Sequence, residues 1–179
     1  MDVPLVIVAV AIAIAVIAAA AGLLYFNPSI TGILGQSKDE QQKLIMSQEV
    51  RSGSNGYRQV NVMVNGVMLF ADVATTDEQI TKGLSVKHVL AENEAMLFVF
   101  DSEAKHTFWM KNMKFPIDII WIDTDKAVVH IEHNLQPCSS EFLCTTYRPV
   151  DDSLYVLETV AGFAEKYDVV KGTMVEFEL

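Results

Sequence analysis

An uninterrupted apolar segment at the N-terminus constrains this chain more than any other feature of its sequence. From Val3 to Phe26 the residues carry no charge, and the Tyr25 hydroxyl is the only polar side-chain group. A helix crosses a bilayer with about 20 apolar residues, whereas a cleavable signal usually has a basic start and a shorter apolar run. The segment therefore predicts an uncleaved transmembrane anchor over residues 1–26. Cleavage within Ala18–Gly22 is the alternative.

Small residues repeat along the predicted anchor. Ala15 and Ala19 are four positions apart, as are Ala18 and Gly22. This spacing lets transmembrane helices approach closely and favours a membrane-protein partner. The alternative is a chance pattern in an alanine-rich helix.

Two cysteines, Cys138 and Cys144, lie six positions apart in the loop-like segment "QPCSSEFLCTTY". Two thiols this close predict a local disulfide, and disulfides persist outside the cytoplasm. A zinc site that recruits His130 and His133 is the competing interpretation. Residues three apart on a strand point to opposite faces, which disfavours it, and no metal site is predicted. The disulfide favours a single-pass protein with its C-terminal domain outside the cytoplasm.

The composition argues against nucleic acid as a partner. The formal net charge of the chain is −10 at pH 7. A nucleic-acid-binding surface neutralises phosphate groups with an excess of lysine and arginine side chains. An acidic chain does not have that excess. The same charge disfavours adsorption to an anionic membrane surface, so the membrane contact is assigned to the N-terminal helix.

The remaining chain divides into a linker, residues 27–57, with one short helix, and a β domain, residues 58–179. Asn65-Gly66 stands between two alternating apolar runs and predicts a β-hairpin. Thr75 and Glu78 have capping-box spacing and predict a short helix that ends at Gly83. Further short apolar runs with turn signals predict a compact sandwich or small barrel with one or two short helices, mostly β. Those runs are "AMLFVF", "KHTFWMKN", "IDIIWID", "AVVHIEHN", "LYVLETV" and "MVEFEL".

Four segments resemble, in the same order, a known family of uncharacterised proteins. They are "TKGLSVKHVLAENEAMLFVF", "FWMKNMKFPIDIIWID", "PCSSEFLCTTY" and "YVLETVAGFAEKYDVVKGTMV". The family is the domain of unknown function 192, and the resemblance covers roughly residues 60 to 179. It implies a compact, mostly β domain that is often exported behind a signal or an anchor. It implies no reaction and no cofactor.

The polar residues of "FWMKNMKFPIDIIWID" are the candidate functional residues. Lys111 and Asn112 are separated from the strand that begins at Ile117 by only four residues, so we expect a hairpin that brings Lys111, Asn112 and Asp118 into one cluster. The cluster is either a structural ion pair or, with Trp109, part of a ligand-binding cleft. His106, just before this segment, is a further candidate for ligand binding or proton transfer.

No nucleophile, base and oxyanion donor can be assembled from the sequence, and familiar catalytic motifs are missing from it. The sequence therefore favours a non-enzymatic module: an anchored extracytoplasmic β domain that binds an unidentified ligand or partner, as an accessory subunit of a membrane complex. The alternative is an envelope-associated hydrolase or transferase that uses His106, Lys111 and Asp118.

Overall fold

The computed structural model describes residues 51–52, 56–138 and 143–179, and it confirms a mostly β domain with two short α-helices. The helical elements are α3 (Asp77–Lys82), the 3-10 helix η1 (Gly83–Val86) and α4 (Phe163–Lys166). The strands are β1 (Arg51–Ser52), β2 (Arg58–Val64), β3 (Val67–Ala74), β4 (Glu94–Ala104), β5 (Phe108–Trp109), β6 (Ile117–Ile122), β7 (Val128–Leu135), β8 (Thr146–Tyr147), β9 (Ser153–Val160) and β10 (Val175–Phe177).

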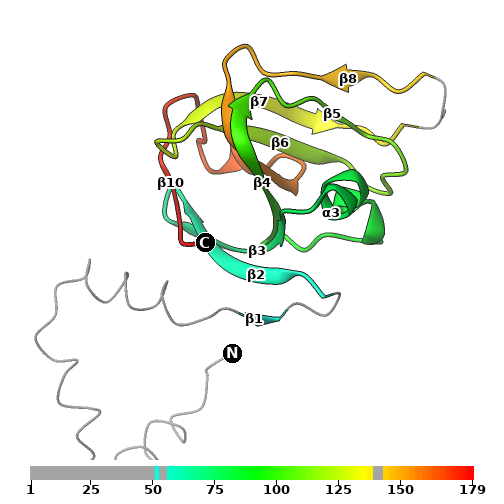
Figure 1. The fold of residues 1–179 in the computed structure, drawn as a ribbon, viewed down its shortest axis with the longest axis horizontal. Helices are drawn as coiled ribbons and strands as arrows, with labels where there is room; N and C mark the ends of the chain where they lie inside the picture. The colour runs from blue at the N-terminus through cyan, green and yellow to red at the C-terminus, as the bar shows by residue number, and fades with distance from the viewer. Residues whose placement is uncertain (1–50, 53–55, 139–142) are drawn as a thin grey trace, which may run out of the picture. The chain divides into compact units, whose positions relative to one another are not determined.

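The domain is organised around one sheet with the strand order β1-β2-β3-β4-β9-β6-β7, and β10 pairs with β2 off this path. Strands β3 and β4 are parallel, and α3 and η1 form the connection between them. The pairs β4–β9, β9–β6 and β6–β7 are antiparallel. Figure 1 shows the curled sheet with α3 beside β4 and the separate β5–β8 pair above it.

The sheet curls until its two ends meet through β10. Backbone hydrogen bonds join Val128 N–H to Thr173 O at 2.9 Å and Val175 N–H to Lys126 O at 2.9 Å. Because β10 also pairs with β2, these bonds connect the start of β7 to the opposite end of the sheet. The result is a barrel-like fold in which these hydrogen bonds pair backbone groups that would otherwise lie at the two edges of the sheet.

Two apolar clusters lie on the two faces of the curled sheet. Leu157 and Ile120 belong to the cluster inside the curl. Val156 and Trp121 belong to the cluster on the outer face, which the α3–η1 segment and the chain around Met110 cover. Strand side chains alternate between faces, so β6 and β9 are buried on both sides. This double burial explains why β6 reads as an almost continuous apolar run.

The hairpin predicted at Asn65-Gly66 is confirmed. Val64 pairs with Val67 across the turn, and Asn65 and Gly66 have φ angles of 49° and 80°. These angles are those that a two-residue type I′ turn requires.

The predicted capping residues of α3 are wrong by one position. Thr76, rather than Thr75, is the N-cap residue, and its hydroxyl accepts a hydrogen bond from Gln79 N–H at 3.3 Å. The Gln79 side chain completes the capping box by accepting from Thr76 N–H at 3.2 Å. Glu78 therefore does not cap the helix, and it pairs with Lys82 instead.

The predicted hairpin between the strand of Lys111 and the strand of Asp118 is also wrong. Strand β5 ends at Trp109 and pairs with β8, whereas β6 pairs with β7 and β9. Asn112 has a φ angle of 61°, which no extended strand contains. The chain thus turns at Asn112 and enters a different sheet before β6 begins.

The predicted anchor at residues 1–26, with its small residues, and the predicted linker helix lie outside the described residues. In the part of the chain that the structure describes, no helix is long and apolar enough to cross a membrane.

Candidate functional site

A pocket of about 240 Å³ opens on the outer face of the sheet, between the α3–η1 segment and the chain around β5. Its residues come from four parts of the sequence: the α3–η1 connection, β4, residues 106–113 and β9. They are Ile80, Thr81, Lys82, Gly83, Leu84, Ser85, Phe98, Phe100, His106, Thr107, Phe108, Trp109, Lys111, Met113 and Glu158.

Glu158 carries the buried carboxyl group of this pocket. It lies in the second half of β9, where Met96 and Ile119 are its direct neighbours on the two adjacent strands. Both neighbours are fully buried, and Glu158 itself is only 4% exposed. The carboxyl group is therefore held against the apolar cluster on the outer face of the sheet.

The carboxyl group of Glu158 is only partly hydrogen-bonded. The backbone of Leu84 hydrogen-bonds to the carboxyl, but Oε2 has no partner, and it is the one such buried side-chain atom among the described residues. Burial raises the pKa of Glu158 to about 8, although the hydrogen bond from the Leu84 backbone acts in the opposite direction. Burial disfavours the ionised carboxylate, so the carboxyl group is mostly protonated at pH 7.

Gly83 allows η1 to approach this carboxyl group. Its φ angle is +48°, a conformation that residues with a side chain rarely adopt. A Cβ atom at this position would lie 3.4 Å from Cζ of Phe98 and 3.9 Å from Oε2 of Glu158. Glycine therefore both permits the turn from α3 into η1 and leaves the space beside Glu158 open.

Aromatic rings form much of the pocket wall. The rings of Phe98 and Phe108 meet edge to face with centroids 4.9 Å apart, and His106 stacks on Phe100 at 3.5 Å. Buried Trp121 supports this wall from below, because its Nε1–H donates to the backbone oxygen of His106 at 2.8 Å. The wall is rigidly packed and apolar.

Two lysines lie at the pocket, and they differ in their partners. Lys82 forms an ion pair with Glu78 at 2.6 Å. Lys111 has its Nζ 5.7 Å from the centroid of the half-exposed Trp109 ring. Within the described residues Lys111 has no carboxylate within ion-pair distance, so its charge is uncompensated.

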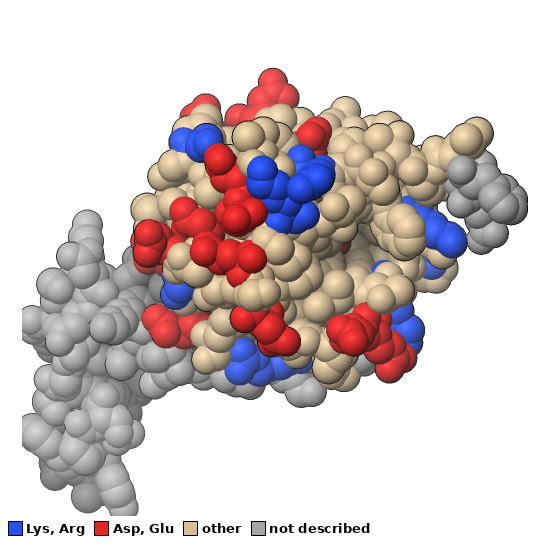
Figure 2. Space-filling model, turned by 45° about the horizontal axis from the view of Figure 1, so that its top comes forward, with Lys and Arg blue, Asp and Glu red and all other residues tan. Residues whose placement is uncertain are grey.

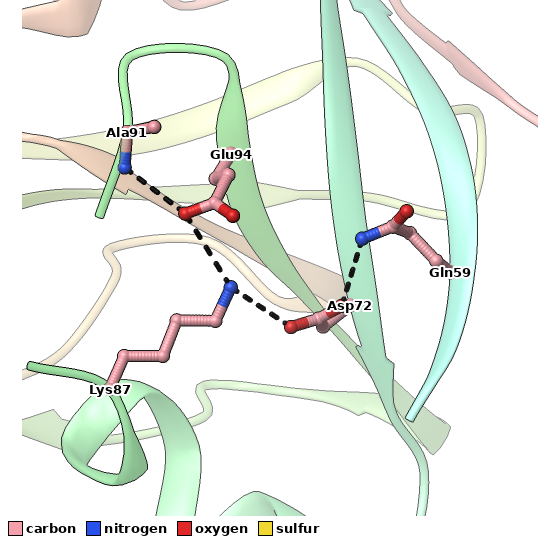
Figure 3. Close-up of polar contacts among 5 residues, drawn as sticks. All are labelled: Gln59, Asp72, Lys87, Ala91 and Glu94. Atoms are coloured by element: carbon pink, nitrogen blue, oxygen red, sulfur yellow. Dashed lines mark hydrogen bonds and ion pairs between the residues drawn. The ribbon is translucent and has the colours of Figure 1, made fainter. Parts of the chain in front are cut away.

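A second polar network holds the segment that follows η1 against the sheet (Figure 3). Lys87 Nζ lies 3.0 Å from Asp72 Oδ2 and 3.7 Å from Glu94 Oε2. Gln59 donates to Asp72 at 3.1 Å, and the N–H of Ala91 donates to Glu94 at 3.1 Å. Asp72 is almost fully buried, so this network fixes one wall of the pocket to β3 and β4.

The predicted cluster of Lys111, Asn112 and Asp118 is not formed. The Asp118 carboxylate accepts hydrogen bonds from the backbone N–H groups of Asn134 at 2.8 Å, Gly162 at 3.0 Å and Ala164 at 2.9 Å. Asp118 shares its strand face with Ile120, which lies inside the curl. Three backbone donors satisfy this buried carboxylate, and no ion pair with Lys111 exists in the described structure.

The structure thus divides the five candidate residues into two groups. His106, Trp109 and Lys111 line the pocket, whereas Asn112 is an exposed turn residue and Asp118 joins β6 to β7 and α4. Sequence reasoning missed Glu158 and the pocket role of Gly83. The available signal was the single carboxylate inside "LYVLETV", the same kind of signal that drew attention to Asp118.

Cys138 and Cys144 form a disulfide, as predicted. The two sulfur atoms are bonded to each other, so the alternative zinc site is not formed, and His130 instead contacts Glu132 at 3.2 Å. Cys138 N–H donates to the backbone oxygen of Met110 at 3.1 Å, and Cys138 forms a β-bridge with Lys111. The disulfide segment is therefore attached to the chain that carries Trp109 and Lys111.

Charged side chains are unevenly distributed on the surface. On the face shown in Figure 2, acidic side chains gather in clusters, and basic side chains lie among or beside them. This arrangement agrees with the acidic composition of the chain. Interspersed charges of both signs keep a domain soluble and do not form an extended basic surface on that face.

Comparison with known proteins assigns the domain to a family. The family model of the domain of unknown function 192, described as an uncharacterized ACR, matches residues 60–177. The match covers more than half of the chain and includes strands β3 to β10 and the pocket, so this chain belongs to that family. No curated protein matches the chain significantly.

Two solved structures are similar to this chain. A crystal structure of a protein of unknown function from Novosphingobium aromaticivorans DSM 12444 has 27% sequence identity and a TM-score of 0.67, and the alignment covers 80% of this chain and 100% of that one. A crystal structure from Sinorhizobium meliloti 1021, described as a candidate transcription regulator, has 28% identity and a TM-score of 0.62, with 69% and 97% covered. Both support the same fold.

Proposed function

We propose that this protein is a membrane-anchored, extracytoplasmic binding module that captures a small polar ligand in the Glu158 pocket. The observation that carries the proposal is the unpartnered Oε2 atom of a buried carboxyl group that borders a pocket. Buried polar groups in folded proteins almost always have hydrogen-bond partners. A ligand that hydrogen-bonds to Oε2 supplies the partner that the protein does not.

The walls of the pocket support binding rather than a purely structural role. Ligand pockets are mostly apolar and aromatic, with a few polar groups that fix the ligand's orientation. The aromatic residues Phe98 and Phe108 and the polar residues Glu158 and Lys111 provide this combination. A volume of about 240 Å³ suits a small metabolite or one unit of a longer polymer.

The residues at the pocket favour binding over catalysis. Glu158 is the only carboxylic acid among the lining residues, and the Ser85 hydroxyl already donates to the backbone oxygen of Lys82 at 2.5 Å. The other candidate for proton transfer, His106, has its Nε2 hydrogen-bonded to the backbone oxygen of Ser102 at 3.1 Å and stacks on Phe100. Hydrolysis by an acid–base pair needs a second group that activates the nucleophile. The envelope-enzyme alternative relied on Asp118, whose carboxylate is bound to three backbone N–H groups on the other face of the sheet.

The location outside the cytoplasm is part of the proposal. The apolar segment Val3–Phe26 supplies an anchor of sufficient length, and a disulfide persists in an oxidising compartment. Protease added to right-side-out membrane vesicles should degrade the β domain, and inverted vesicles should protect it. Protection in right-side-out vesicles, or two free thiols in the purified protein, would exclude this location.

Ligand capture is tested with the full chain in detergent and a library of small polar metabolites. We expect at least one compound to give a saturable thermal shift with the unmodified protein and with Glu176→Gln, a control at an exposed carboxylate. Glu158→Gln should abolish that shift. Equal binding by Glu158→Gln, or no binding by any compound, would contradict the proposed function.

A further inference from the structure

The inner end of the pocket offers a buried carboxyl oxygen that has no hydrogen-bond partner. Leu84 already donates to the Glu158 carboxyl from the backbone, and Oε2 accepts nothing. Around this atom the pocket is lined by rings, including Phe98 and Phe108. Aromatic rings stabilise a cation over their faces, and a carboxylate adds direct charge pairing. An ammonium group satisfies both features, whereas a hydroxyl group uses only the carboxyl oxygen.

Another part of the pocket offers a positive charge. Lys111 lines the same pocket, and its charge has no carboxylate partner among the described residues. Lys82 is different, because Glu78 already neutralises it. A ligand that carried only a positive charge would be repelled by Lys111, and a ligand that carried only a negative charge would leave Glu158 without a cationic partner. A neutral polar ligand can hydrogen-bond to both groups, but it gives neither of them a partner of opposite charge.

We propose that the pocket binds a small zwitterionic amine, with its ammonium group on Oε2 of Glu158 and its anionic group on Lys111. This inference rests on the proposed function and adds the chemical class of the ligand. A free amino acid and an aminoethyl phosphate share this chemistry. The binding assay distinguishes them, because the first carries a carboxylate and the second a phosphate.

Binding of this ligand is coupled to the release of one proton. The pocket's titratable groups are Lys82, His106, Lys111 and Glu158. Burial keeps Glu158 protonated when the pocket is empty, and an adjacent ammonium group favours the ionised form. The carboxyl O–H bond therefore breaks as the ammonium group binds, the proton passes to the solvent, and the ligand keeps its own protons.

The test uses isothermal titration calorimetry on the full chain in detergent at pH 7. The probes are a panel of free L-amino acids and O-phosphoethanolamine, with ethanolamine as the cation alone, acetate as the anion alone and glucose as a neutral compound. We expect one or more zwitterions to bind at least about tenfold more tightly than ethanolamine, acetate or glucose. Titrations in two buffers that differ in ionisation enthalpy, neither of which binds to the protein in a blank titration, should differ in apparent enthalpy by the amount that about one released proton predicts.

Variants assign the two ends of the ligand. Glu158→Gln should weaken zwitterion binding at least about tenfold, and Lys111→Met should weaken it by a similar factor without weakening ethanolamine. Lys114→Met, an exposed neighbour that does not line the pocket, is the matched control and should bind normally. Lys111→Met removes no buried group, so it remains informative if Glu158→Gln folds poorly.

Three results would overturn the inference. Glucose or ethanolamine that binds more tightly than every zwitterion, in a manner that depends on Glu158, would reject the ligand class and leave the proposed function intact. Zwitterion binding that is equal in Lys111→Met and Lys114→Met would reject the role of Lys111. No binding that depends on Glu158, for any probe or any library compound, would reject both proposals.

Discussion

Replacement of Glu158 by glutamine should stabilise the folded protein, and the gain should increase with pH. In the unfolded chain this carboxyl group has its ordinary pKa of 4.5, and in the folded protein burial raises the pKa to about 8. Below pH 4.5 both states are protonated, so the carboxyl adds no pH-dependent penalty. Between pH 4.5 and 8 the unfolded state releases a proton that the folded state retains, and stability falls as the pH rises.

The magnitude follows from the size of the pKa shift. One pKa unit corresponds to about 1.4 kcal/mol, so at pH 7 the shift lowers the stability of the unmodified protein by about 3 kcal/mol. Above pH 8 the penalty reaches its limit of about 5 kcal/mol, because the carboxyl group is then ionised in both states. Glutamine resembles the neutral acid in shape and does not titrate, so Glu158→Gln escapes this penalty.

The assay is equilibrium unfolding in urea from pH 4.5 to pH 8, with the disulfide intact and tryptophan fluorescence as the signal. Trp121 is fully buried and reports the loss of the core around the pocket. The difference in unfolding free energy between Glu158→Gln and the unmodified protein should widen by roughly 1 kcal/mol per pH unit. A Glu176→Gln control should show a constant difference. A constant difference for Glu158→Gln as well would refute the claim that the folded protein keeps this group protonated.

Three further substitutions test other parts of the structure by thermal or urea unfolding. Asp118→Ala should destabilise the domain by about 3–5 kcal/mol, because three backbone N–H groups lose their acceptor; a change below about 1 kcal/mol would contradict this role. Gly83→Ala should destabilise it more than Gly172→Ala, because both have positive φ angles but only Gly83 has Phe98 and Glu158 beside it; equal effects would contradict the argument. Lys87→Met should lower the free energy of unfolding by about 3 kcal/mol, because Asp72 stays buried without its cation. Lys114→Met is the control at an exposed position, and equal stability of the two variants would show that the network is dispensable.

The features that the sequence predicted correctly are local in the chain. The turn at Asn65-Gly66 depends on two adjacent residues that accept positive φ angles. The disulfide joins cysteines six positions apart. The individual strands follow from short runs of apolar residues. Such features are determined by neighbours in sequence, which the printed sequence shows directly.

The features that the sequence missed depend on distant pairing. Strand β5 pairs with β8, almost forty positions later, and this pairing removes Lys111 from the neighbourhood of Asp118. The pocket likewise requires the α3–η1 segment and β9, which lie far apart in the chain. The local sequence signal for the turn was the asparagine itself, because Asn112 adopts a positive φ angle that asparagine tolerates better than most residues. An asparagine before a methionine does not by itself require a turn, however.

Asp118 and Glu158 show why a buried carboxylate cannot be assigned a role from its strand alone. Both lie in apolar strands that pair with each other, and Asp118 is directly opposite Thr159, the residue after Glu158. This one-residue offset turns the two side chains to opposite faces of the sheet. Inside the curl, the turn into α4 and the end of β7 supply three N–H donors to Asp118. On the outer face, Glu158 meets rings and one backbone hydrogen bond from Leu84. The unsatisfied carboxyl is therefore the one beside the pocket, which is why the proposed ligand is placed at Glu158 and not at Asp118.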